Sequence, residues 1–181
     1  MDFKDINMLM RDGTYEVDVE LCLLEEFIED YKKTYNLELN PDFQRGHVWT
    51  EEQQIKYVEF FLRGGKTGRT VYFNCADWIV GGDYNSNPMQ CVDGLQRITA
   101  LLKFVRNEIP AFGCYYKDFE GRPRRNQSVL HINVNSLSSK LEVLEWYLQM
   151  NEGGVVHSKE EIDRVKGLIE NEKAKNDTKN K

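Results

Sequence analysis

The residues in this sequence that are best suited to chemistry lie together in Gln90–Phe104, a stretch that reads Gln-Cys-Val-Asp-Gly-Leu-Gln-Arg-Ile-Thr-Ala-Leu-Leu-Lys-Phe. Asp93 and Arg97 stand four residues apart there, and Gly94 and Gln96 lie between them. A guanidinium binds phosphate or carboxylate groups, a carboxylate holds a metal or an arginine, and an amide orients a ligand or a water. These types and spacings point to a site that handles an anion.

The elements that must position these residues are a strand, a tight turn and a helix. Cys91 and Val92 are typical of a short buried strand, and the Asp93-Gly94 pair is typical of a turn. Asp93 is expected to cap the helix, with Gln96 completing a capping box. The helix itself is predicted from apolar residues at helical spacing, namely Ile98, Leu101, Leu102 and Val105.

Arg97 is the residue that ordinary helix initiation does not explain. The first turn carries the positive end of the helix dipole, where a cation costs about 0.3–1 kcal/mol. A bound anion removes that cost, because free backbone N–H groups, the dipole and the guanidinium then converge on it. The alternative is that Arg97 turns away to pair with an acid. The stretch alone leaves both interpretations open.

Length and composition indicate one globular domain. The chain has 181 residues, a net charge of −6 and a sequence pI of about 5.2. That charge argues against broad electrostatic coating of DNA, although a local positive pocket is compatible with it. No apolar run reaches the roughly 20 residues of a membrane span, and no secretory signal is recognisable. Four widely spaced cysteines indicate reduced thiols, so a cytoplasmic location without membrane association is expected.

The remaining pattern predicts an α+β fold with a domain over residues 1–169 and a charged, disordered tail over 170–181. Helices are expected from Asp18, from Thr50 with Gln53 in a capping box, and from Ser139 with Glu142. Strands are expected around Leu37 and Leu39 and over residues 69–75, 109–116 and 129–134.

Three segments together resemble one family. They are Pro-Asp-Phe-Gln-Arg-Gly-His-Val-Trp at 41–49, Val-Asp-Gly-Leu-Gln-Arg-Ile-Thr at 92–99 and Asn-Glu-Gly-Gly at 151–154. In this order they resemble the N-terminal domain of GmrSD-type modification-dependent restriction endonucleases, within the ParB-like and sulfiredoxin-like superfamily. The resemblance covers residues 35–165.

The resemblance implies a ParB-like α+β domain, a small mixed sheet with helices packed around it. It also implies binding of a nucleoside triphosphate, with Mg²⁺, and in some members its hydrolysis. Asp93, Gln96 and Arg97 become the candidate catalytic residues, and Asp93 the candidate metal ligand. The candidate nucleotide- or phosphate-binding residues are Gln44, Arg45, Gly94, Arg97, Thr99, Asn151, Gly153 and Gly154.

Two departures from the family pattern matter, Leu95 and the run Val155-Val156-His157, which differs from the hydrophobic ending expected after the double glycine. Leu95 stands where the family signature Asp-Gly-Gln-Gln-Arg has its first glutamine, which puts hydrolysis in question. The family's restriction enzymes also carry a C-terminal nuclease domain with an HNH-type motif, which this sequence lacks. We therefore expect a stand-alone short form of the domain, connected to restriction–modification or phage defence.

Arg45 and Arg97 both lie beside glycine-containing turns, so we expect the two turns to abut and share one ligand. The leading hypothesis is a domain that binds and cleaves or senses an NTP. A second is a ParB-like nuclease that grips or nicks DNA with the same arginines. A third is a non-enzymatic module that binds a protein of a host or defence system.

Overall fold

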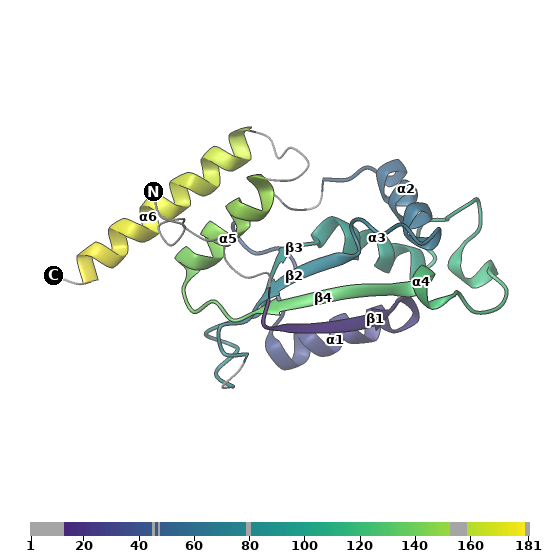
Figure 1. The fold of residues 1–181 in the computed structure, drawn as a ribbon, viewed down its shortest axis with the longest axis horizontal. Coiled ribbons are helices and arrows are strands. Elements are labelled where there is room, and N and C mark those ends of the chain that lie inside the picture. Colours follow the sequence, from purple (N-terminus) through teal and green to yellow (C-terminus); the bar gives the residue numbers. More distant parts are fainter. Residues whose placement is uncertain (1–12, 45, 47, 79–80, 153–158, 180–181) are drawn as a thin grey trace, which may run out of the picture.

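The structure of the chain, a computed structural model, describes residues 13–44, 46, 48–78, 81–152 and 159–179. These residues form a four-stranded sheet with helices packed around it (Figure 1). The predicted α+β class with a small mixed sheet is confirmed. In chain order the elements are β1 (Tyr15–Glu20), η2 (Leu21–Leu23), α1 (Leu24–Tyr35), α2 (Glu51–Leu62), β2 (Thr70–Asn74), β3 (Gln90–Asp93), α3 (Leu95–Val105), η3 (Tyr116–Asp118), α4 (Arg125–Ser128), β4 (Val129–Asn135), α5 (Lys140–Glu152) and α6 (Lys159–Lys179).

The sheet has the order β1-β4-β2-β3. Strand β4 is antiparallel to β1 and parallel to β2, and β2 is antiparallel to β3. Ile132 of β4 lies opposite Val17 on one side and Val71 on the other. Strand β4 lies inside the sheet, and all of its residues except His131 are buried, including the polar Asn133 and Asn135.

Alternate residues of β2 serve two separate cores, as the two-residue period of a strand requires. Val71 and Phe73 face a core shared with α1, α2 and α3, whose largest buried members include Phe61, Phe104, Ile28, Leu24, Ile98 and Leu101. Tyr72 faces the other side, where β3 contributes Val92. There the sheet is covered by α5, α6 and the loop before α2, through Phe43, Val143, Leu144, Trp146, Tyr147, Val165 and Ile169.

Several local predictions are confirmed. Thr50 caps α2, accepting from the Gln53 N–H, and Gln53 bonds back to the Thr50 N–H. The strands expected at 69–75 and 129–134 are β2 and β4. Ser139 and Glu142 form the expected reciprocal bonds at the start of α5.

The expected first helix from Asp18 is wrong at its start. Residues Tyr15–Glu20 form β1, and helix α1 begins at Leu24. Val17 and Val19 pack on the main core, while Asp18 bonds His131 on the neighbouring strand at 2.6 Å. Pairing with β4 overrides the cap-like position of Asp18, because the strand buries two valines that an isolated helix start would expose.

Two expected strands are also absent from the described residues. Around Leu37 and Leu39 the chain makes only an isolated bridge, Glu38 to Gln90. The stretch 109–116 instead turns back on itself through a bridge between Ala111 and Cys114, with Phe112 at a φ of 51°. A positive φ breaks an extended strand, so buried Ile109 and Ala111 anchor a turn.

The expected disordered tail over 170–181 differs from the structure, in which α6 continues to Lys179. Ion pairs accompany this extension, Lys173 with Glu145 of α5 at 3.2 Å and Lys175 with Glu172 at 2.7 Å. The tail is rich in strong helix formers, which favour propagation once the helix is docked. Among the described helices, none is long and apolar enough to cross a membrane.

Candidate functional site

The turn between β3 and α3 is built around Gly94. Asp93 is the last residue of β3, Gly94 is the N-cap of α3 with a φ of 132°, and the cap lacks a side-chain hydrogen bond. A Cβ at position 94 would lie 2.4 Å from Val71 Cγ1, so the close packing of α3 against β2 needs glycine. The expected capping roles of Asp93 and Gln96 are therefore wrong, because the chain leaves the strand one residue later than the pattern indicates.

The Asp93 carboxylate instead meets Arg97, one helical turn further on. Arg97 donates through Nη2 to Asp93 and through Nη1 to the Thr70 carbonyl on β2. Burial acts to lower the pKa of Arg97, but the charge of Asp93 and the hydrogen bond to it outweigh burial and raise that pKa. The Arg97 side chain is only 15% exposed and that of Asp93 41%, so the pair is held at the surface edge of the core.

Gln96 joins the second motif segment to the first. Its Oε1 accepts from the N–H groups of Val48 at 3.0 Å and Trp49 at 3.1 Å. Its Nε2 donates to the Gly46 carbonyl at 2.7 Å. Both ends of one amide are thus used to hold the loop before α2 against the start of α3.

Gln44 makes a matching connection in the opposite direction. Its Nε2 donates to the carbonyls of Cys91 and of Val92, the latter at 3.1 Å, on β3. The two motif segments, about fifty residues apart in sequence, therefore abut as expected. Arg45 lies outside the described residues, so its convergence with Arg97 on one ligand stays a prediction.

The other predicted site residues are placed as follows. Thr99 donates to the Leu95 carbonyl at 2.7 Å, inside its own helix. Asn151 belongs to the last turn of α5, whereas Gly153 and Gly154 lie outside the described residues. Asp93 faces Arg97, and no group of three or more potential metal ligands occurs in the part of the chain that the structure describes.

The predictions from the sequence did not include the residues of α2 and of the loop after it that lie beside Arg97. Tyr57 donates to the Gly68 carbonyl at 2.8 Å, and its ring lies 5.4 Å from that of Trp49. A Cβ at Gly68 would lie 3.8 Å from Arg97 Cδ, so this loop passes directly beside the guanidinium. The sequence signal that could have revealed them is the run Gly-Gly-Lys-Thr-Gly at 64–68. This run ends a helix, and it is also a glycine-rich loop that carries a lysine.

The thiol and the phenol beside Arg97 are not activated. Burial, followed by the negative charge of Asp93, raises the pKa of Cys91 to about 12. Burial also raises the pKa of Tyr57 to about 12. Both groups stay neutral near pH 7, so the charged chemistry of the described site belongs to Asp93 and Arg97.

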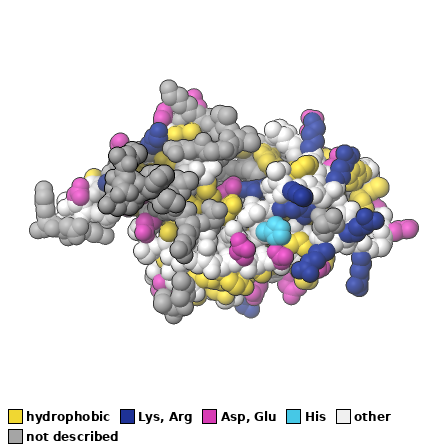
Figure 2. All heavy atoms as spheres, in the orientation of Figure 1, with side chains coloured by type: hydrophobic (Ala, Val, Ile, Leu, Met, Phe, Trp, Pro, Cys, Tyr) yellow, Lys and Arg dark blue, Asp and Glu magenta, His cyan; other side chains and the backbone are white. Residues whose placement is uncertain are grey.

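Positive charge on the surface is local. On the face shown in Figure 2, lysine and arginine side chains gather toward the end of the molecule where α2 and α4 lie. Arg122, Arg124 and Arg125, at and before the start of α4, are exposed, and Arg125 lies 3.7 Å from Asp18. This face therefore carries a basic end without a continuous basic coat, in keeping with the net negative charge.

A family comparison agrees with this arrangement. The model of the GmrSD restriction endonuclease N-terminal domain matches residues 24–128, more than half of the chain. The chain belongs to the GmrSD N-terminal domain family. Comparison with curated proteins and with solved structures gives no match. The matched region of this GmrSD N-terminal domain contains the Gln44 loop and the Asp93–Arg97 junction, so the hydrogen-bonded core of the site lies inside the family unit.

Proposed function

We propose that the junction between β3 and α3 binds a nucleoside triphosphate. The observation that carries the proposal is that Gln44 and Gln96 fasten the two motif segments together at a helix start that also holds Arg97. A helix N-terminus without a side-chain cap presents backbone N–H groups to an anion. Arg97 has five N–H donors and uses two in the described bonds, so a phosphate has donors left to engage.

The neighbouring loop supplies further groups that suit a polyphosphate. Lys66 and Thr67 are exposed in the glycine-rich segment whose Gly68 passes beside Arg97. A lysine adds a mobile positive charge and a threonine adds a hydroxyl donor. Mg²⁺ commonly enters such sites with the nucleotide, held by its phosphates and by one or two carboxylates. Asp93, part-exposed at the rim, fits as the single protein carboxylate of that kind.

Leu95 argues for binding with little hydrolysis. The family signature has a glutamine at this place, whereas Leu95 is 8% exposed and therefore turned largely into the protein. It has no polar group with which to orient an attacking water. Leu95→Gln tests this directly: we expect steady-state phosphate release from bound NTP to rise in the variant relative to the natural sequence.

Isothermal titration with ATP, GTP, CTP and UTP, with and without Mg²⁺, tests the binding proposal. Charge-assisted bonds to a guanidinium are worth roughly 1.5–3 kcal/mol, so Arg97→Ala should weaken binding by about 10- to 150-fold. Arg106→Ala is the matched control, because Arg106 caps the far end of α3 and pairs with Glu25 at 2.7 Å. Failure of every nucleotide to bind, or unchanged binding in Arg97→Ala, would overturn the proposal.

We do not assign nuclease chemistry to this site. Phosphodiester hydrolysis by metals needs well-held ions, and across the described ranges no cluster of three potential ligands includes Asp93. Plasmid nicking that requires a metal and is lost in Asp93→Ala would contradict this view.

A further inference from the structure

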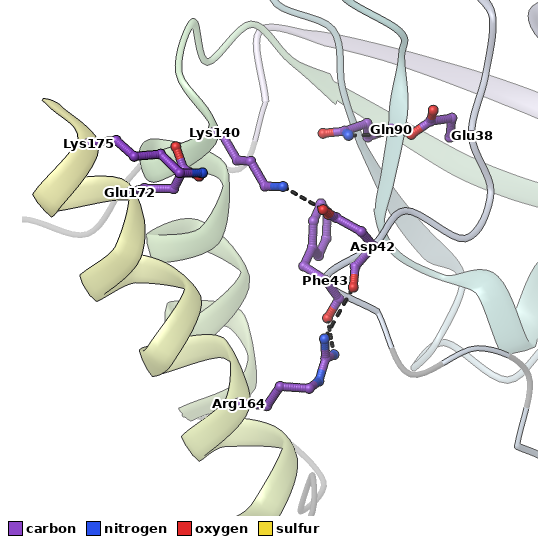
Figure 3. Close-up of polar contacts among 8 residues, drawn as sticks. All are labelled: Glu38, Asp42, Phe43, Gln90, Lys140, Arg164, Glu172 and Lys175. Carbon is purple, nitrogen blue, oxygen red and sulfur yellow. Dashed lines mark hydrogen bonds and ion pairs between the residues drawn. The ribbon is translucent and has the colours of Figure 1, made fainter. Parts of the chain in front are cut away.

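Helix α6 reaches across to the loop that leads into the first motif. Arg164 donates through Nη1 to the carbonyl of Asp42 at 3.1 Å and through Nη2 to the carbonyl of Phe43 (Figure 3). The very next residue is Gln44, which is bonded to β3. Arg164 lies outside the segment matched by the family model, which ends at residue 128.

The same loop has two other attachments to the helical pair α5 and α6. Lys140 pairs with the Asp42 carboxylate at 2.5 Å. The Phe43 ring is fully buried, and its centroid lies 5.6 Å from that of Tyr147 in an edge-on arrangement. The two residues before Gln44 are thus fixed by helices on one side, and Gln44 itself is fixed by the sheet on the other.

The contact between the helices and this loop is made by discrete side chains. One hollow of about 510 Å³ lies between Asp42 and α6, and a second of about 450 Å³ lies beside Asp42 toward Glu38 and Gln90. Lys140 lines both hollows, so its ion pair to Asp42 spans the space between them (Figure 3). The Phe43 side chain packs in the core beneath, so the polar contacts of Lys140 and Arg164 are what holds the exposed side of the loop.

We propose that Arg164 is a positioning residue for the site at the start of α3, acting through the backbone of Asp42 and Phe43. This inference rests on the proposed nucleotide-binding function. A planar guanidinium can donate to two successive carbonyls at once, which fixes the direction of the backbone between them. Lysine has no such fork, so Arg164→Lys retains the charge and loses the geometry.

The contact also couples α6 to the ligand. Coupling between two sites is reciprocal, so a nucleotide that binds more tightly when the loop is held must also stabilise the docked helix. Most of α6 is exposed, with Val165 and Ile169 as its buried residues, so we expect its docking to open at lower free energy than the sheet.

Hydrogen exchange measured by mass spectrometry on the nucleotide-free protein gives the first test. In Arg164→Met, amides in the peptide 41–50 should exchange faster, including the Gln44 N–H that bonds the Pro41 carbonyl at 2.9 Å, while β2 and β4 stay protected. Lys166→Met is the matched control, because Lys166 is exposed two residues along the same helix. Unchanged exchange in the peptide, or a uniform increase across the sheet, would overturn the inference.

Titration with the nucleotide that binds the natural sequence most tightly gives the second test. Arg164→Met should weaken binding by about 2- to 30-fold, with Arg164→Lys intermediate and Lys166→Met unchanged. Nucleotide should also slow exchange in α6 of the natural sequence and not of Arg164→Met. Faster loop exchange with unchanged affinity overturns the positioning role. If the natural sequence binds no nucleotide, the proposed function is wrong. In that case, hydrogen exchange in the peptide 41–50 still decides whether Arg164 holds the loop.

Discussion

At the scale of single residues, Gln96 connects the two motif segments most directly, because both ends of its amide are used. Gln96→Glu keeps an oxygen for the N–H groups of Val48 and Trp49 but places a second oxygen against the Gly46 carbonyl. Two acceptors then face each other without a proton between them. We expect the free energy of unfolding to fall by about 1–3 kcal/mol, measured by urea denaturation near pH 7.

Gln53→Glu is the matched control for that substitution. Gln53 uses its oxygen to accept from the Thr50 N–H at 2.9 Å, which a glutamate does equally well in a capping box. Stability should therefore change little. Equal losses in the two variants would show that the Gln96 nitrogen contributes nothing to the site.

Residue identities are easier to predict from the sequence than residue partners. The pattern singles out Asp93, Gln96 and Arg97, but capping rules consider only near neighbours and assign Asp93 and Gln96 to the helix start. Gln96 bonds residues that are 47–50 positions away, and that distance is closed only by the packing of the loop on the sheet. Tyr57 and Gly68 reach the surroundings of Arg97 for the same reason, so local spacing does not reveal them.

At the scale of elements, the β3–α3 turn depends on Gly94. Gly94→Ala must accommodate a Cβ 2.4 Å from Val71 Cγ1 at a φ of 132°. Backbone strain of about 1–3 kcal/mol and overpacking of about 1–3 kcal/mol should together lower the unfolding free energy by about 2–6 kcal/mol. Chemical denaturation of the purified variant measures the loss.

Gly113→Ala separates strain from collision. Gly113 also has a positive φ, 76°, but no described atom lies within 4 Å of the position that a Cβ would take there. Only the strain should remain, about 1–3 kcal/mol. If Gly94→Ala costs no more than Gly113→Ala, close packing of α3 on β2 is not what requires the glycine.

The start of α5 should make stability depend on pH. Hydrogen bonds from Ser139 lower the pKa of Glu142 in the folded state. The stabilisation is therefore present above the unfolded pKa, about 4.3, and is lost as pH falls through the folded value. Urea titrations between about pH 5 and pH 3 should show a smaller decline in Glu142→Gln than in the natural sequence. Parallel declines would mean that the capping box is not the titrating group.

Elements with strong local signals are predicted well from the sequence, and those fixed by pairing are not. The caps at Thr50 and Ser139 work through neighbours three residues away, which a sequence displays directly. The local pattern of β1 resembles a helix start. The segment is a strand because it pairs with β4, which lies more than a hundred residues later in the chain. The sequence around Phe112 resembles that of a strand, because the spacing of apolar residues does not reveal the positive φ of Phe112.

At the scale of the whole molecule, the family segment and the folding unit differ. The match ends at residue 128, one residue before β4, and begins after β1. A fragment of residues 24–128 would keep only the β2–β3 pair of the four-stranded sheet. A two-stranded pair is marginally stable alone. We therefore expect circular dichroism to show that the fragment is unfolded and that residues 13–179 are folded. Well-dispersed amide resonances from the shorter fragment would contradict this.

Strand order is not predictable from local pattern, because it is a property of the complete chain. The sequence indicates the small mixed sheet as a class, yet the placement of β4 between β1 and β2 depends on pairing with strands that are distant in the sequence. Likewise, the charged end of α6 looks unstructured by composition, and its ion pair to Glu145 becomes visible only when α5 lies alongside.

The central position of β4 also has a consequence for synthesis on the ribosome. β4 is the last strand of the described sheet to be made, so β1 lacks its sheet partner and β2 has only β3 while the nascent chain grows. Unpaired strand edges invite pairing with other chains, and charged side chains discourage it. β1 carries Glu16, Asp18 and Glu20 at exposed positions, and we expect their negative charges to discourage pairing with other chains before β4 has been made. The same three acids then lie along the outer edge of the finished sheet and discourage pairing there.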